Sequence, residues 1–343
     1  MRTVLLAAPR GFCAGVERAV LIVRELLDRL GPPVYVRKQI VHNRHVVAEL
    51  TARGAVFVEE VGQVPRGAVA VFSAHGVAPE VRAEAEAREL RVYDATCPLV
   101  AKVHAEALRY ARDGYTIALI GHEEHEEVEG TRGEAPERIH VVSNPEQARA
   151  LAVSDRKLVW LSQTTLALDD VARTAEALRE RFPAMADPPG EDICYASQNR
   201  QNAVKAIAPR CDLLLVVGST NSSNSVRLVE VAQEAGAGAA RLLDDGGGLR
   251  AEWLAGVETV GVTAGASAPE HAVDDLLAAL AAHGFDHVEQ VGSLAENVSF
   301  DLPAALRSPR HARPTHGSAH ESAAQSAPES VPRSAPAPEP GAD

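Results

Sequence analysis

Four cysteines are the residues of this chain with the widest range of possible chemistry. Cys13 lies between glycines in a predicted strand-to-helix turn, Cys97 precedes a proline and Cys194 precedes a tyrosine, whereas Cys211 stands directly before an apolar run. Such widely spaced cysteines do not form a disulfide framework. Without a C-x-x-C pair, their spacing alone establishes neither a zinc nor an iron–sulfur site. Two interpretations stay open: thiols that pack as small apolar groups, or three thiols that converge from separate domains.

Histidines with neighbouring carboxylates form a second set. His42 lies in Val-His-Asn, His75 in Ser-Ala-His-Gly, and His122 and His125 in Gly-His-Glu-Glu-His-Glu-Glu-Val. Zinc proteases place two histidines four residues apart, whereas His122 and His125 are three apart. The segment fits a solvated acidic loop. It also fits proton delivery, because a carboxylate beside histidines at a strand end suits general acid–base chemistry.

Hydroxyl and amide side chains form a third set at predicted helix starts. They are Thr164, Thr165, Ser267 and the run Ser222-Ser223-Asn224-Ser225. Each of these residue types is an ordinary helix N-cap, but several in a row exceed what one helix needs. Free N–H groups and hydroxyl donors at a helix N-terminus bind phosphate or diphosphate groups. The pattern therefore predicts an anion site whose motifs contain no Lys or Arg.

Short apolar runs predict the elements that must position these side chains. Strands are expected at residues 4–8, 68–72, 116–120, 158–161, 213–217 and 257–262, and helices at 16–30, 79–90, 169–181, 225–235 and 269–282. Strands that alternate with helices indicate parallel α/β sheets, and about six such units suggest three small domains of similar build. Ligands of such sheets bind outside the carboxyl ends of the strands, where nearly every unusual polar residue of this chain falls.

Composition excludes several classes of function. The chain has 343 residues, with 34 Lys and Arg against 47 Asp and Glu, and its net charge of −13 argues against nucleic-acid binding. The apolar run at residues 4–8 is shorter than the roughly 7–15 residues of a signal-peptide core, and no run approaches the roughly 18 that span a membrane. We therefore expect a cytoplasmic protein with reduced thiols and no membrane partner. Residues 308–343, rich in Pro, Ala and Ser, are predicted to be a disordered tail.

Eight segments together resemble the LytB/IspH family, the 4-hydroxy-3-methylbut-2-enyl diphosphate reductases. They are residues 9–16, 41–43, 73–77, 94–100, 163–166, 192–196, 217–225 and 263–269, and the resemblance covers residues 1–307 in order. No dinucleotide fingerprint, P-loop or Gly-x-Ser-x-Gly elbow competes with this assignment.

The resemblance implies a fold and a cofactor. Three similar small α/β domains with largely parallel sheets are expected around one [4Fe–4S] cluster per chain, held by Cys13, Cys97 and Cys194. Three thiolates leave one iron open, and Cys211 matches no ligand position. The implied domains are residues 14–97, 98–193 and 194–283, the last completed by 1–13 and 284–307, with the tail at 308–343.

The resemblance also implies a reaction. The allylic diphosphate substrate would bind the open iron through its hydroxyl group, which Thr164 would help to place and Glu127 would protonate. Two electrons, delivered singly by a ferredoxin or flavodoxin, would complete reductive dehydroxylation to isopentenyl and dimethylallyl diphosphates, the last step of the non-mevalonate isoprenoid pathway. The residues implied to hold the diphosphate are His42, His75, His125, Ser222, Ser223, Asn224 and Ser267.

One position departs from the family pattern, which usually reads His-Pro-Glu-Val. This chain has His125-Glu126-Glu127-Val128, so a carboxylate replaces the proline. The register still assigns Glu127 as the acid, but Glu126 is expected to loosen the loop and to compete for the proton.

Two other functions remain as hypotheses. One is a zinc-dependent phosphohydrolase that uses His122, His125 and a carboxylate, which would stay active without the loop cysteines. The other is a phosphometabolite-binding protein built on the same anion pocket, which would bind its ligand without turnover.

Overall fold

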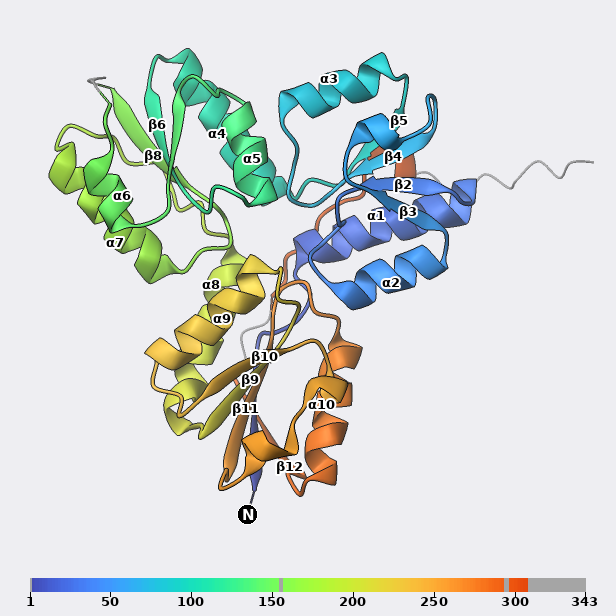
Figure 1. Ribbon diagram of the computed structural model, residues 1–343, viewed down its shortest axis with the longest axis vertical. Coiled ribbons are helices and arrows are strands. Elements are labelled where there is room, and N and C mark those ends of the chain that lie inside the picture. Colours follow the sequence, from blue (N-terminus) through green and yellow to red (C-terminus); the bar gives the residue numbers. More distant parts are fainter. Residues whose placement is uncertain (1, 154–156, 293–295, 308–343) are drawn as a thin grey trace, which may run out of the picture. The chain divides into compact units, whose positions relative to one another are not determined.

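The computed structural model describes residues 2–153, 157–292 and 296–307, and within these its strands form three separate parallel sheets (Figure 1). The first sheet has the order β3 (Ala55–Val58), β2 (Val34–Arg37), β4 (Val69–Phe72), β5 (Arg91–Asp94). The second has the order β7 (Ile139–Val142), β6 (Thr116–Ile120), β8 (Leu158–Ser162). The third has the order β10 (Ala240–Leu243), β9 (Leu213–Val217), β11 (Thr259–Ala264), β1 (Thr3–Ala7), β12 (His287–Val291).

Continuous apolar runs explain the central strands. Every residue of β6 and of β9 is buried, as expected for parallel strands that helices cover on both faces. In the third sheet the blue N-terminal strand β1 pairs with β11 and β12 from the other end of the chain (Figure 1). The first residues of the sequence therefore complete a sheet that is otherwise built from its last third.

Along the sequence most helices alternate with the strands, and each helix buries one face. In α1 (Ala14–Leu30) the buried residues include Ala19, Val23 and Leu26, a helical spacing, and the helix ends at Gly31 with φ 76°. The other helices are α2 (Arg44–Ala52), α3 (Pro79–Ala87), α4 (Pro98–Arg112), α5 (Glu126–Gly133), α6 (Pro145–Ala150), α7 (Leu168–Arg181), α8 (Tyr195–Ile207), α9 (Ser223–Glu234), α10 (Glu270–Ala282) and α11 (Ala304–Arg307).

The predicted fold class, three small parallel α/β sheets, is confirmed. All six predicted strands exist, as β1, β4, β6, β8, β9 and β11, and the five predicted helices are α1, α3, α7, α9 and α10. Each sheet lies within one of the expected domains, but residues 1–309 form one compact unit, so the domain boundaries stay a prediction. The predicted disorder of residues 308–343 falls outside the described residues.

None of the described helices is both long and apolar enough to cross a membrane.

Candidate functional site

One cavity brings together the residues that the sequence analysis selected. Most of these residues lie in or beside loops that follow strands of the three sheets. Cys194 is the exception, because it directly precedes α8. The selected residues that line the cavity are Cys13, His42, His75, Cys97, His125, Glu127, Thr164, Cys194, Ser222, Ser223, Asn224 and Ser267. Thr165, Ser197 and Gly15 line it as well, and the sequence analysis assigned no such role to Ser197 or Gly15. Below, the three cysteines are called the sulfur wall, and the histidines, serines and Asn224 the anion wall.

Each cysteine of the sulfur wall caps the N-terminus of a helix. Cys13 is the N-cap of α1, Cys97 of α4 and Cys194 of α8. A helix N-terminus carries unsatisfied N–H groups and a partial positive charge, both of which stabilise a thiolate. Three different helices therefore direct their positive ends at this wall.

The sulfur atoms are close to the backbone but not close enough together to hold a single ion. A Cβ atom at Gly15 would lie 2.6 Å from Cys97 Sγ and 3.9 Å from Cys13 Sγ, so only glycine fits there. Among the described residues, the three sulfurs do not form a group whose ligand atoms all lie within 4.8 Å of one another. Soft thiolates at wider separation fit a polynuclear iron–sulfur group better than a lone zinc ion.

Burial keeps the thiols of Cys97 and Cys194 protonated in the absence of a cation. It raises the pKa of Cys97 to about 12 and the pKa of Cys194 to about 11, and the neighbouring thiols act in the same direction. A bound metal centre favours thiolates strongly enough to reverse this. The donor set therefore fits a cationic iron group, whose binding would release protons.

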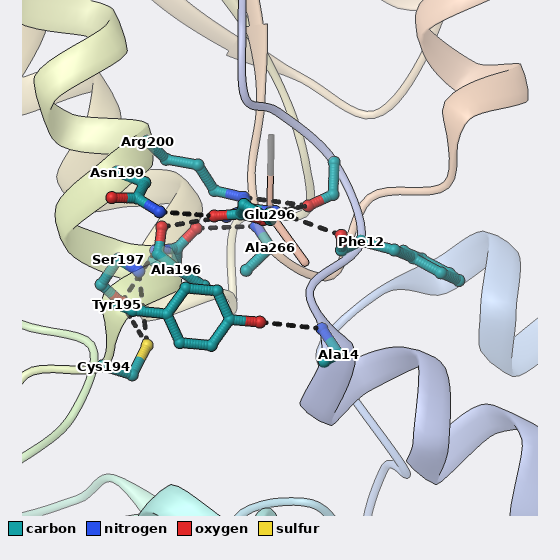
Figure 2. A network of polar contacts seen from close by, with 12 residues as sticks. Phe12, Ala14, Cys194, Tyr195, Ala196, Ser197, Asn199, Arg200, Ala266 and Glu296 are labelled. Carbon is teal, nitrogen blue, oxygen red and sulfur yellow. Dashed lines mark hydrogen bonds and ion pairs between the residues drawn. The ribbon is translucent and has the colours of Figure 1, made fainter. Parts of the chain in front are cut away.

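A buried arginine ties two of the cysteine loops together (Figure 2). The Arg200 side chain donates to the backbone oxygens of Gly11 at 2.7 and 2.9 Å and of Phe12 at 3.1 Å, directly before Cys13. It also donates to Ala196 O at 3.0 Å, on the helix that Cys194 caps, and pairs with the Glu296 carboxylate at 3.0 and 3.1 Å. Arg200 is completely buried, so this pair fixes the relative position of the two loops.

Two neighbours of Cys194 reinforce the same region (Figure 2). The Ser197 backbone N–H donates to Cys194 Sγ at 3.3 Å, and its hydroxyl lies 3.1 Å from the sulfur. The Tyr195 hydroxyl accepts from the Ala14 backbone N–H at 3.4 Å. The motif analysis missed Arg200, Ser197 and Glu296. A polar stretch on the otherwise buried helix α8 could have indicated Ser197 and Arg200. No local pattern indicates Glu296, which lies 96 residues from Arg200.

Glu127 lies in the first turn of α5 and is fully enclosed. Its carboxylate accepts from the Thr164 backbone N–H at 2.6 Å and from the Thr164 hydroxyl at 3.1 Å. Burial raises its pKa, and the two bonds from Thr164 only partly offset this effect. The carboxyl group is thereby held as a proton donor between the two walls of the cavity.

Glu126 points into a different environment. Its Oε2 atom lies 3.2 Å from His75 Nδ1. Burial acts to raise the pKa of Glu126, but His75 together with the charges of His42 and Lys38 outweighs it and brings the pKa down to about 2. The pKa of the carboxylate expected to compete for the proton is therefore lowered, whereas the pKa of the neighbouring Glu127 is raised.

The histidines of the anion wall pack ring against ring. His42 and His75 are stacked with centroids 4.1 Å apart, and His125 meets them edge-on at 5.6 and 5.8 Å. Burial, reinforced by the neighbouring His75, lowers the pKa of His42 and of His125 to about 3. These two rings are neutral in the empty cavity, and a nearby anion would favour their protonated form.

The same geometry weakens the zinc hypothesis. His122 lies in neighbouring pockets outside this cavity. The described residues contain one group of three close ligand atoms, from His42, His75 and Glu126. Imidazole lone pairs lie in the ring plane, so two rings stacked at 19° do not aim at one ion. Neither the predicted pair nor this group forms a zinc site as positioned.

Hydroxyl and amide groups complete the anion wall beside the start of α9. The Ser222 and Ser267 hydroxyls are 3.3 Å apart, and Ser267 donates to His42 O at 3.0 Å. Asn224 Oδ1 accepts from the Ala266 N–H at 2.8 Å, which fixes the amide. Ser222 is also the N-cap of α9, so hydroxyls and a helix N-terminus face the same space.

The fold and the cavity define an α/β protein in which three parallel sheets surround a single site lined by cysteines and an anion pocket. The model of the LytB protein family matches residues 4–281, and the chain belongs to this family.

Relatives and solved structures agree with this assignment. The 4-hydroxy-3-methylbut-2-enyl diphosphate reductase of Leifsonia xyli subsp. xyli is 59% identical over 307 residues, which is 89% of this chain and 91% of the relative. The enzyme of the same name from Acidothermus cellulolyticus is 58% identical over 313 residues, 91% of this chain and 92% of the relative. The structure of the E-1-hydroxy-2-methyl-but-2-enyl-4-diphosphate reductase from Plasmodium falciparum superimposes with a TM-score of 0.86 at 38% identity, covering 89% of this chain and 96% of that one.

Proposed function

We propose that this protein is a 4-hydroxy-3-methylbut-2-enyl diphosphate reductase that removes the allylic hydroxyl group and forms isopentenyl and dimethylallyl diphosphates, the last step of the non-mevalonate pathway. The observation that carries the proposal is the cavity itself, in which three thiols, a buried carboxyl group with a raised pKa and an anion wall face one another. The names of relatives at 58–59% identity support the same reaction.

The cofactor follows from the sulfur wall. We infer that Cys13, Cys97 and Cys194 hold one [4Fe–4S] cluster per chain, with one iron that has no protein ligand. When bound, this group supplies single electrons and a Lewis-acid iron for the substrate hydroxyl. The helix N-termini and the N–H and O–H groups of Ser197 stabilise the thiolate form of its ligands.

The anion wall binds the diphosphate end of the substrate. The hydroxyls of Ser222 and Ser267 and the amide of Asn224 donate hydrogen bonds, and the incoming anion favours protonation of His42 and His125. Charge for the diphosphate is thus generated locally, in a protein whose net charge is −13.

Glu127 and Thr164 act on the hydroxyl group. Thr164 orients it, and Glu127 transfers its proton so that the oxygen leaves as water. The overall reaction consumes two electrons and two protons, breaks one C–O bond and forms one C–H bond. Glu127 is suited to the first proton because burial raises its pKa and so favours the protonated form.

The electron donor is proposed to be a ferredoxin or flavodoxin, since single electrons are required, and the cytoplasm is proposed as the compartment. Two features support the latter: all four cysteines are free thiols, and no described helix crosses a membrane.

An anaerobic assay tests the proposal. Brown protein with roughly four irons per chain is expected, and with a reduced one-electron dye it should convert the allylic diphosphate to the two products. A colourless, iron-free preparation after anaerobic reconstitution would contradict it. Tight diphosphate binding with iron present but no turnover would instead favour the phosphometabolite-binding hypothesis.

A further inference from the structure

Because Glu127 is buried, a proton that it gives away in the proposed function, on which this inference rests, is not readily replaced from solvent. After it transfers its proton, a fully enclosed carboxylate remains beneath the bound substrate. The next turnover requires that this carboxylate recover a proton. An enclosed acid that works repeatedly needs either exchange through the open cavity or an internal path to solvent.

One face of α5 leads from Glu127 toward solvent. Gly130 and Glu134 follow Glu127 at spacings of three and seven residues, which places all three on the same side of the helix. Glu127 is buried at the start of the helix, whereas Glu134, at its C-cap, is partly exposed. The face therefore joins the cavity to the surface over about two helical turns.

A histidine packs against the middle of this face. His104 of α4 is buried, with Nδ1 only 2.9 Å from Glu134 Oε1. A Cβ atom at Gly130 would lie 3.0 Å from the His104 ring, and one at Gly76 would lie 2.9 Å from its Nε2. Two glycines, on α5 and in the loop after His75, thus admit the imidazole between these elements.

The other ring nitrogen of His104, Nε2, is buried and has no hydrogen-bond partner among the described residues. Buried polar atoms of this kind generally bind a water molecule or have a functional role. Burial is the main cause that raises the pKa of Glu127, and the charge of His104 is among the effects that oppose it, so the two groups interact electrostatically.

We propose that Glu134 and His104 form a proton relay that reprotonates Glu127 from solvent after each turnover. An imidazole can release a proton from one ring nitrogen while it accepts another at the second, which is the property a relay needs. The unpartnered Nε2 provides the inner end of this path and the Glu134–Nδ1 contact the outer end.

The proton balance is as follows. Glu127 gives its proton to the leaving hydroxyl, which departs as water. Starting with its proton on Nε2, the His104 ring passes that proton to the Glu127 carboxylate through bridging water while Nδ1 takes up the proton that Glu134 has accepted from solvent. The ring then returns to its Nε2–H tautomer by proton exchange with water before the next turnover. No electron moves in these steps, and the donor of the reductase reaction supplies both electrons.

Burst kinetics of the reconstituted enzyme test the relay. In His104→Gln, the first turnover should keep its rate because Glu127 begins protonated, and later turnovers should be at least tenfold slower. Glu134→Gln should show the same burst with a smaller slowing. His140→Gln changes an exposed histidine on β7 and should behave as the unchanged protein.

Infrared difference spectra give a readout that does not depend on rate. The C=O band of the protonated Glu127 carboxyl group, assigned by its loss in Glu127→Gln, should recover slowly after one turnover in His104→Gln. Unchanged kinetics in both relay variants would show that Glu127 regains its proton through the cavity. Equal slowing of first and later turnovers would show a purely structural role, and either result overturns the relay. An inactive unchanged enzyme would instead contradict the proposed function.

Discussion

Burial shifts the pKa values on the two walls of the cavity in opposite directions, and on both walls it favours the neutral form. On the sulfur wall it raises the thiol pKa values of Cys97 and Cys194 to about 12 and 11. On the anion wall it lowers the imidazole pKa values of His42 and His125 to about 3. When nothing is bound, these groups on both walls are neutral. On the proposed function, each wall would become charged only with its partner, a cationic metal group on one side and an anionic diphosphate on the other.

The same contrast separates two adjacent residues. Glu126 faces the anion wall and is ionised by His75, whereas Glu127 faces Thr164 and keeps a raised pKa. Successive residues of a helix point about 100° apart, so neighbours in sequence can lie in different environments. Position, not residue type, decides which carboxyl group is the acid.

The largest expected effect comes from removing one thiol of the sulfur wall. Cys97→Ser should lose most of its iron and nearly all activity, because a hydroxyl replaces a thiolate ligand. Iron analysis and the visible absorption spectrum measure this. Cys211→Ser is the control, since Cys211 is buried, donates to Ile207 O and does not line the cavity. Iron loss in both variants, or in neither, would contradict the assignment of three ligands.

Removing the acid between the walls should have the next largest effect. Glu127→Gln should lower kcat by roughly 10²–10⁴-fold with little change in KM, because the amide has no proton of suitable acidity to transfer. Steady-state kinetics at saturating donor measure it. Full activity in this variant would transfer the role of the acid to Glu126 or to water.

Arg200 should matter for stability rather than for chemistry. Arg200→Met leaves the partly buried Glu296 without its cation and removes bonds to Gly11 and Phe12. We expect the free energy of unfolding to fall by roughly 3–5 kcal/mol, as measured by denaturant titration. The double variant with Glu296→Gln should recover part of the loss, and no recovery would show that the ion pair itself is unimportant.

Diphosphate binding should take up protons. His42 and His125 have pKa values of about 3 in the empty cavity, so at pH 7 the bound anion must draw protons onto them. Affinity should therefore fall as pH rises, by up to about tenfold per pH unit for each proton taken up. Calorimetry with inorganic diphosphate in two buffers of different ionisation enthalpy measures the number. Zero proton uptake would mean that the histidines bind the anion as neutral rings.

The smallest effect is expected at Glu126. Glu126→Gln removes a negative charge beside the anion wall while it retains a polar contact to His75, so KM should fall roughly fivefold, or about 1 kcal/mol. The value of kcat should stay nearly constant because Glu127 remains in place. A loss of kcat as large as that of Glu127→Gln would show that the two carboxyl groups share the proton.

Sequence patterns predict the elements that depend on local sequence alone. The strands β6 and β9 are uninterrupted apolar runs, and they were predicted at the residues where they lie. The strand β5 was missed because its sequence, Arg-Val-Tyr-Asp, is half exposed and carries no apolar run. Among the helices, α5 was missed because its acidic residues read as a loop.

The site shows the same limit. Motifs locate the cysteines, histidines and serines because each lies in a short segment with a distinctive pattern. Arg200 with Glu296, and His104 with Glu134, are pairs separated by 96 and 30 residues, and each member alone resembles an ordinary helix or loop residue. Only the folded chain brings the members of each pair into contact, the first pair between the cysteine loops and the second at the proposed relay to Glu127.

The pairing of β1 has a consequence for synthesis. Thr3 pairs with Thr259 on one side and with His287 on the other, so the strand that leads to Cys13 has no neighbour until the ribosome has added β11, and it gains its second neighbour only with β12. Contacts so distant in sequence form late, after most of the chain is available. The cavity that all three cysteines line is therefore completed only after β11 has been synthesised. On the proposed function, iron and sulfide would then be delivered to a chain that already includes this strand.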